Sequence, residues 1–84
     1  VIVCCFEGVG AVEVVRQMAG TTNGRKALPG TIRGDFAMSS QENIVHTSDS
    51  IENAAIELKR FFKDEEIFDY KSAATAFIYA ADEV

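Results

Sequence analysis

Apolar residues recur at two different spacings and divide the chain into expected strands and helices. Residues 1–6 form a continuous apolar run, which predicts a strand covered on both faces. Over residues 11–19 the apolar side chains recur every three or four positions, which predicts a helix that ends at Gly20. Residues 43–46 are a candidate for a second, shorter strand.

A second helix is expected from about residue 50 to Phe62. Asp49 and Glu52 have the spacing of a capping box, and Ser48 and Ser50 are alternative caps. One apolar stripe follows the helix, and we expect it to face a core. Its members are Ile51, Ala54, Ala55, Leu58 and Phe62.

The remaining segments show little periodicity. Residues 21–31 contain two turn-forming pairs that end in glycine, which predicts a long loop of the kind that often carries function. Residues 32–38 fit a strand by propensity and a turn by the pair Gly34-Asp35, and both interpretations stay open. The tail, residues 67–84, is apolar, and we expect it to pack over another part of the protein.

With 84 residues the chain makes one domain with a small core, so it needs stabilisation from disulfides, metals or other protein surfaces. Cys4 and Cys5 are neighbours and cannot pair in ordinary geometry, and one histidine with two adjacent cysteines does not form a structural zinc site. We therefore expect a reducing, cytoplasmic location and an oligomer. Because the sequence enters a strand-like run without an initiator Met, we also expect a longer parent protein. The run is too short to span a membrane.

Charge is distributed unevenly along the chain. The formal net charge is −5, which makes general binding to nucleic acid unfavourable. Residues 1–34 carry four basic and two acidic side chains, a balance of +2, whereas residues 35–84 carry four basic and eleven acidic ones, a balance of −7. The first half therefore suits a small anion.

His46 is the only histidine, and it lies where the shorter strand candidate meets the second helix. A neutral imidazole is a good nucleophile when a carboxylate holds its other ring nitrogen. Glu57, two turns into the helix, is placed to do this, and Ser48 is placed to bind the glutamate. The plainer alternative is that His46 satisfies a backbone group and that Glu57 is solvated.

Arginine, threonine and asparagine side chains supply candidate contacts for a phosphorylated ligand. Arg16 and Arg33 offer the planar, permanently charged donors that phosphate groups prefer, and Thr22 and Asn43 add neutral polar groups. Each of the four also has a plainer interpretation as ordinary surface. No glycine-rich phosphate loop is present, so a nucleotide would have to be held by side chains.

Together these pieces resemble the nucleoside diphosphate kinases. The resemblance covers nearly the whole chain in order and spacing, and PGTIRGDF followed by NxxHxSDS is its most specific part. The matching segments are FEG at 6–8, Arg16-x-x-x-Gly20, Thr22-Asn23, LPGTIRGDF at 28–36, NIVHTSDS at 43–50 with Glu57 downstream, and FFKDEEIFDYKS at 61–72.

The resemblance implies an activity and a set of roles. A nucleoside triphosphate would phosphorylate His46, which would pass the phosphoryl group to a nucleoside diphosphate in a ping-pong reaction. Mg²⁺ would arrive with the nucleotide phosphates, and Asp49 would meet it through water. The catalytic set would be His46, Glu57 and Ser48, and the nucleotide-binding set Arg16, Thr22, Arg33 and Asn43.

The resemblance also implies a fold and a truncation. The family fold is α+β and ferredoxin-like, βαββαβ, and assembles as tetramers or hexamers. Residues 1–84 would supply only its second half with the C-terminal tail. We therefore expect an active parent and an inactive 84-residue segment, and the alternative is a non-catalytic assembly or interaction module. Two departures from the family are Thr47, where Gly or Ala is usual, and Ser40-Gln41-Glu42, which replaces a frequent apolar base contact.

Overall fold

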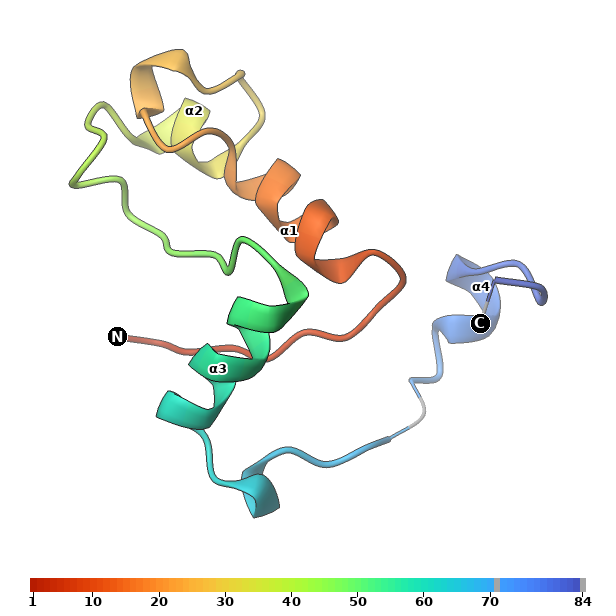
Figure 1. Cartoon of the computed structure of the whole chain (residues 1–84). Helices are drawn as coiled ribbons and strands as arrows, with labels where there is room; N and C mark the ends of the chain where they lie inside the picture. Colours follow the sequence, from red (N-terminus) through yellow and green to blue (C-terminus); the bar gives the residue numbers. More distant parts are fainter. Residues whose placement is uncertain (71, 84) are drawn as a thin grey trace.

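The computed structural model describes residues 1–70 and 72–83, so the tail expected over 67–84 lies partly outside the described residues. The helices α1, α2 and α3 lie along one connected body, and the segment with α4 extends away from it (Figure 1). The helical elements are α1 Ala11–Ala19, the 3-10 helix η1 Gly24–Lys26, α2 Ile32–Phe36, α3 Ile51–Phe61, the 3-10 helix η2 Asp64–Glu66 and α4 Thr75–Ile78.

The prediction of strands is wrong for this structure. Residues 1–6 and 43–46 form no strand, and none occurs elsewhere in the described ranges, so the expected α+β class and βαββαβ order do not appear in the secondary structure. A strand exists only when a neighbouring strand accepts and donates its backbone hydrogen bonds. Residues 1–7 make no backbone hydrogen bond with any other described residue. They are exposed, not covered on both faces.

The prediction for α1 is confirmed, because the helix spans Ala11–Ala19 as the spacing indicated. It begins after Gly10, which has a left-handed backbone with φ 63°, and ends at Gly20, with φ 88°. A side chain at Gly20 would also collide with the Thr31 hydroxyl. Glycine therefore serves both the conformation and the close approach of the segment before α2.

Residues 32–36 form the short helix α2, which neither of the two interpretations of that segment anticipated. The Thr31 hydroxyl accepts a hydrogen bond from the Gly34 amide and so caps the helix. Residues 21–31 form the expected loop, with η1 inside it, and the Asn23 side chain accepts from the Arg25 amide. Local side-chain caps, rather than periodicity, decide the structure of this region.

The second predicted helix is present as α3, Ile51–Phe61, but its cap differs from the Asp49 capping box. Ser50 is the N-cap, and its hydroxyl accepts from the Asn53 amide at 3.1 Å. The Asp49 carboxylate instead binds the Asn53 side chain. The choice between the competing caps was therefore made by geometry at the helix start.

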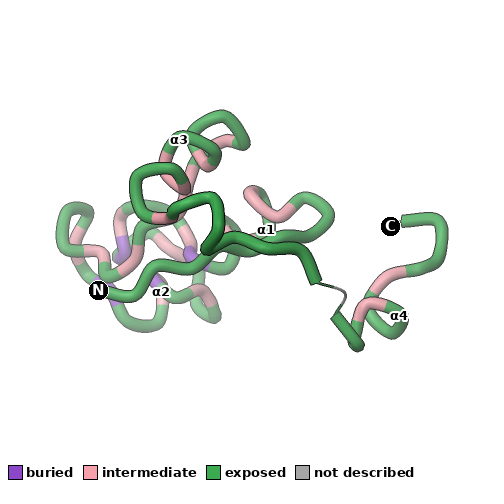
Figure 2. Tube along the Cα trace, turned by 90° about the horizontal axis from the view of Figure 1, so that it is seen from below, coloured by how far each residue is buried: buried purple, intermediate pink, exposed green. Residues whose placement is uncertain are grey.

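The expected core is not formed. Only Ala19, Gly24, Arg33 and Ala37 are buried among the described residues, and α3 buries none of its stripe (Figure 2). The accessible surface is 7273 Å², against roughly 4,900 Å² for a compact monomer of this mass. The radius of gyration is 14.8 Å, against about 12 Å for a compact domain of this length. The apolar faces are therefore available to further protein surface.

Candidate functional site

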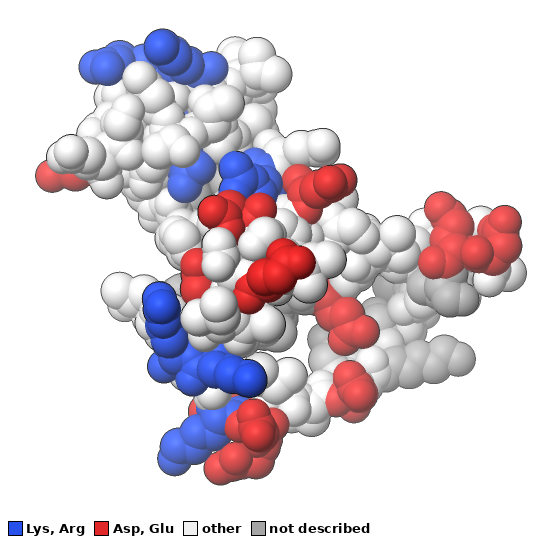
Figure 3. All heavy atoms as spheres, in the orientation of Figure 1, with Lys and Arg blue, Asp and Glu red and all other residues white. Residues whose placement is uncertain are grey.

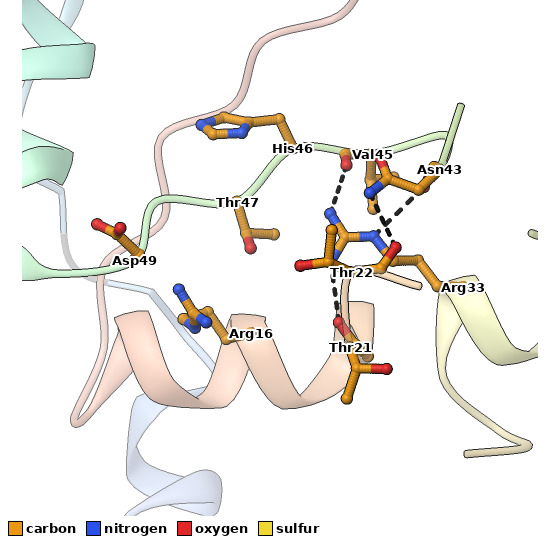
Figure 4. A pocket seen from close by; sticks show the side chains of 10 residues that line it. Arg16, Thr21, Thr22, Arg33, Asn43, Val45, His46, Thr47 and Asp49 are labelled. Atoms are coloured by element: carbon orange, nitrogen blue, oxygen red, sulfur yellow. Dashed lines mark hydrogen bonds between the residues drawn. The ribbon is translucent and has the colours of Figure 1, made fainter. Parts of the chain in front are cut away.

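Polar side chains from three separate segments gather around one pocket of about 380 Å³ (Figure 4). One side of it comes from α1 and the residues after it, one from α2, and one from the extended segment before α3. The lining residues are Arg16, Gly20, Thr21, Thr22, Arg33, Asn43, Val45, His46, Thr47 and Asp49. Six of these are predicted site residues, which the fold brings together from positions 16 to 49.

His46 and Glu57 are joined by a hydrogen bond across 11 positions of sequence. Nε2 of the ring lies 2.8 Å from Oε2 of Glu57, and the Ser48 hydroxyl donates to the same oxygen at 3.0 Å. The predicted contacts of Glu57 are therefore both present. A carboxylate has no proton to donate, so Nε2 carries the hydrogen and Nδ1 of the neutral ring keeps its lone pair.

The side chains of His46 and Glu57 differ in their exposure to solvent. The His46 side chain is 75% exposed and that of Glu57 is 24% exposed. The hydrogen bond from His46, and after it the one from Ser48, holds the pKa of Glu57 below its ordinary value. The acid is thus kept ionised, which maintains its ability to accept from Nε2–H.

The backbone just before the histidine is strained. Ile44 has φ 65°, and the Val45 amide donates to the Asn43 carbonyl at 2.8 Å, so Ile44 is the central residue of a γ-turn. A positive φ is unfavourable for a β-branched residue, and γ-turns of this hand are rare. No feature of the sequence indicated this turn. It directs the chain into the segment that carries His46.

Arg33 is buried, with 8% of its surface exposed, and its guanidinium is tied to three backbone carbonyls. Nε donates to Asn43 at 3.3 Å, Nη1 to Gly20 at 2.9 Å and Nη2 to Val45 at 2.7 Å. Three of its five N–H groups are therefore occupied by the scaffold. Arg33 lines the pocket and also fastens the segment before His46 to the end of α1.

The other predicted nucleotide-binding residues differ in how many of their hydrogen-bonding groups the fold already uses. Arg16, on α1, is exposed and lines the pocket. Both N–H groups of the Asn43 amide are occupied, because Nδ2 donates to the Thr22 carbonyl at 3.0 Å and to the Ser40 carbonyl at 2.9 Å. Its carbonyl oxygen is left to accept from a ligand. The Thr22 hydroxyl makes no hydrogen bond to another described residue.

Asp49 is an exposed carboxylate at the edge of the same pocket. The Asn53 side chain donates to its Oδ1, and this hydrogen bond is the main cause that lowers the pKa of Asp49, with the charge of Arg16 contributing less. Among the described residues there is no group of three or more His, Cys, Asp or Glu that could hold a metal ion. One free carboxylate oxygen fits an ion that keeps most of its own water.

Besides the turn at Ile44, the sequence missed three further features of the site. Thr47 had been noted only as a departure, whereas it lines the pocket. The contact between Asn53 and Asp49 was visible as a four-residue spacing at a helix start, which is a usable signal. Arg33 had been expected only to bind phosphate, and its second role depends on carbonyls from distant positions.

Comparison with known proteins identifies the family. The sequence profile of the nucleoside diphosphate kinase family matches residues 1–67. The chain belongs to the nucleoside diphosphate kinase family. It is 70% identical over 83 residues to the nucleoside diphosphate kinase of Parabacteroides distasonis, covering 99% of this chain and 54% of that protein. It is 57% identical over 68 residues to that of Methanocaldococcus jannaschii, covering 81% and 49%.

Solved structures of the family share the arrangement. The crystal structure of a nucleoside diphosphate kinase family protein from Babesia bovis superposes with a TM-score of 0.82 and 37% identity, over 87% of this chain and 49% of that one. The fold is therefore that of the nucleoside diphosphate kinase family, although the described residues pair no strands. The chain spans about half the length of the relatives it matches.

Basic and acidic side chains are interspersed on the face shown in Figure 3. Basic side chains lie at the η1 end, near the middle and again around the end of α3 and η2. Acidic side chains lie near the middle, beside η2 and at the α4 end. Across the described ranges, no helix has the length and apolar character needed to traverse a bilayer.

Proposed function

We propose that this chain is the carboxy-terminal part of a nucleoside diphosphate kinase, which transfers the terminal phosphoryl group of a nucleoside triphosphate to a nucleoside diphosphate through a phosphohistidine on His46. The observation that carries the proposal is the hydrogen bond between Nε2 of His46 and Glu57. It leaves Nδ1 as the nucleophilic nitrogen of a ring that lines the pocket.

The phosphoryl transfer takes place in two half-reactions. In the first, the lone pair of Nδ1 attacks the terminal phosphorus, an N–P bond forms, the bridging P–O bond breaks, and the diphosphate leaves with that oxygen. The hydrogen on Nε2 stays on the ring and remains hydrogen-bonded to the Glu57 carboxylate, which stabilises the positive charge that develops on the ring. In the second half a terminal oxygen of another diphosphate attacks phosphorus, the N–P bond breaks, and the lone pair returns to Nδ1.

The pocket residues support the binding of a nucleotide by side chains. Arg16 and the unused N–H groups of Arg33 are suited to phosphate oxygens, as is the Thr22 hydroxyl. The free carbonyl oxygen of Asn43 is suited to a sugar hydroxyl. Mg²⁺, as part of the nucleotide substrate, would neutralise phosphate charge, and Asp49 would contact its water.

The exposed apolar surface supports assembly and a larger parent. Several large apolar side chains on the first segment, α2 and α3 are more than half exposed, which isolated folded domains avoid; they include Ile2, Phe6, Phe36, Ile51 and Phe61. We propose that the remainder of the parent and other copies, in a tetramer or hexamer, cover them. The two free cysteines, Cys4 and Cys5, fit a cytoplasmic location.

The test is to label the full-length parent with ATP that carries an isotope in its terminal phosphate. One acid-labile, base-stable phosphate per subunit is expected, and a nucleoside diphosphate should remove it. His46→Ala should abolish the label, and Glu52→Gln, an exposed acid on the same helix, should leave it unchanged. A label that survives His46→Ala overturns the proposal.

The second candidate is a non-catalytic assembly module of the same fold. The exposed apolar faces and the coverage of about half of each relative favour it. Its expected result is a protein that assembles through these faces but neither binds nucleotide nor takes up label in any form. Labelling of the unmodified parent excludes it.

A further inference from the structure

The pocket has a hydroxyl whose hydrogen-bonding capacity is not used by the fold. Thr47 is partly buried and lines the pocket immediately after His46. Its side chain extends from the backbone toward α1, the helix that carries Arg16 (Figure 4). No described residue donates to or accepts from the Thr47 hydroxyl. It is therefore free to bind a ligand.

Some hydroxyl groups in and beside the pocket differ from that of Thr47, because the fold already gives them an acceptor. The Thr21 hydroxyl donates to the Asn23 carbonyl at 3.3 Å, and the Ser48 hydroxyl donates to Glu57 at 3.0 Å. Among the hydroxyls of these residues, only those of Thr22 and Thr47 have no acceptor within the described ranges. Thr22 follows α1, whereas Thr47 is the direct neighbour of His46.

A phosphoryl group in transfer presents only acceptors to the protein. Its three equatorial oxygens carry the charge, and catalysis depends on donors aimed at them. His46 and Thr47 both line the pocket, so a phosphoryl group bound to Nδ1 inside it would share the cavity with the Thr47 hydroxyl.

We propose that the Thr47 hydroxyl donates a hydrogen bond to the phosphoryl group that passes between nucleotide and His46, and that Thr47 is thus a further substrate-contacting residue. The inference rests on the proposed function. A diphosphate lacks the transferred group, so Thr47 contributes to both half-reactions but not to the binding of a diphosphate by the unphosphorylated enzyme.

The test compares Thr47→Val, Thr47→Ser and the unmodified full-length parent. The valine keeps the shape and removes the donor, and the serine keeps the donor. We expect Thr47→Val to slow both phosphorylation by ATP and dephosphorylation by a diphosphate about tenfold or more in single-turnover measurements. Thr47→Ser should stay within about threefold of the parent. The dissociation constant for ADP in the absence of phosphorylation should be unchanged in both.

The possible results distinguish a failure of the proposed function from a failure of the role proposed for Thr47. If the unmodified parent takes up no label on His46, the proposed function fails. If it does and Thr47→Val transfers at the parent's rate, only the role of Thr47 is overturned. Equal loss in the serine and valine variants, or weakened ADP binding in Thr47→Val, would also overturn it, because either would mark a general effect on pocket shape.

Discussion

Nε2 of His46 and the carboxylate of Glu57 lie 2.8 Å apart, and the acid comes from the second turn of the helix that follows the histidine. Ser48 donates to the same carboxylate oxygen, so two side chains fix the position of one acid. The contact sets which ring nitrogen holds a proton and leaves the other free. The proposed chemistry depends on this relationship.

Glu57→Ala should slow phosphorylation of His46 by about tenfold to a hundredfold, because the imidazole loses the partner that fixes its tautomer. The dissociation constant for ADP should change little, since Glu57 does not line the pocket. Stopped single-turnover labelling of the full-length parent measures the first, and calorimetry the second. Glu52→Gln is the matched control, and an equal loss there would contradict the assignment.

As pH falls, phosphorylation of His46 should stop before the hydrogen bond between His46 and Glu57 is lost. Imidazole ordinarily gains its second proton between about pH 8 and pH 5, and Nδ1 then has no lone pair. The pKa of Glu57 is lowered in the folded protein. The contribution of ionised Glu57 to the free energy of unfolding is therefore fully present above the ordinary pKa of a glutamate, and it is lost only as pH falls through the lowered pKa.

A single-turnover pH profile checks the first part of this prediction, and an NMR titration of the Glu57 side-chain carboxyl checks the second. The rate of phosphorylation should fall as the solution becomes acidic while the Glu57 signal is still that of a carboxylate. A constant rate from about pH 8 to pH 5, with chemistry limiting, would be inconsistent with His46 as the nucleophile.

Substitutions of Arg33 and Arg16 should have different effects, the first on stability and the second on nucleotide binding. Arg33→Met removes the donors of three backbone carbonyls and should lower the free energy of unfolding by about 2–4 kcal/mol. Arg16→Met, at an exposed position, should leave unfolding nearly unchanged and weaken the binding of ATP about tenfold or more. Denaturant titration and calorimetry on the full-length parent distinguish the two. Similar stabilities for both variants would refute the scaffold role of Arg33.

Ile44→Asn should relieve backbone strain. Asparagine tolerates a positive φ better than a β-branched residue does, so the variant should gain about 0.5–1 kcal/mol in the free energy of unfolding. Val45, the neighbour with an ordinary backbone, is the control site, and Val45→Asn should not stabilise. Thermal unfolding of both variants measures the difference, and destabilisation by Ile44→Asn would show that the side chain matters more than its backbone.

Asn53→Ala should raise the pKa of Asp49 toward its ordinary value. The hydrogen bond from the Asn53 side chain is the main cause of the lowered pKa, and alanine removes it while the Ser50 cap remains. Carbon NMR of the Asp49 carboxyl during an acid titration follows this directly. Arg16→Met should raise the pKa less, and the reverse order would contradict the stated cause.

Local features could be predicted from the sequence because neighbouring residues decide them. The spacing of apolar side chains placed α1 at its observed bounds, and the serines before α3 placed its start to within a residue or two. Glu57 was placed beside His46 because both belong to one short segment and its helix. The motifs around the histidine led to the family that the comparisons identify.

The pairing of strands, the burial of apolar faces and the second role of Arg33 were decided by tertiary structure. Residues 1–6 have the composition of a buried strand, but a strand needs partners that no neighbouring residue supplies. Likewise, Arg33 became a scaffold residue because three distant carbonyls converged on it. The amino-acid order specifies which groups can bind, and only the folded chain specifies which groups meet, since long-range contacts depend on surfaces brought together from different segments.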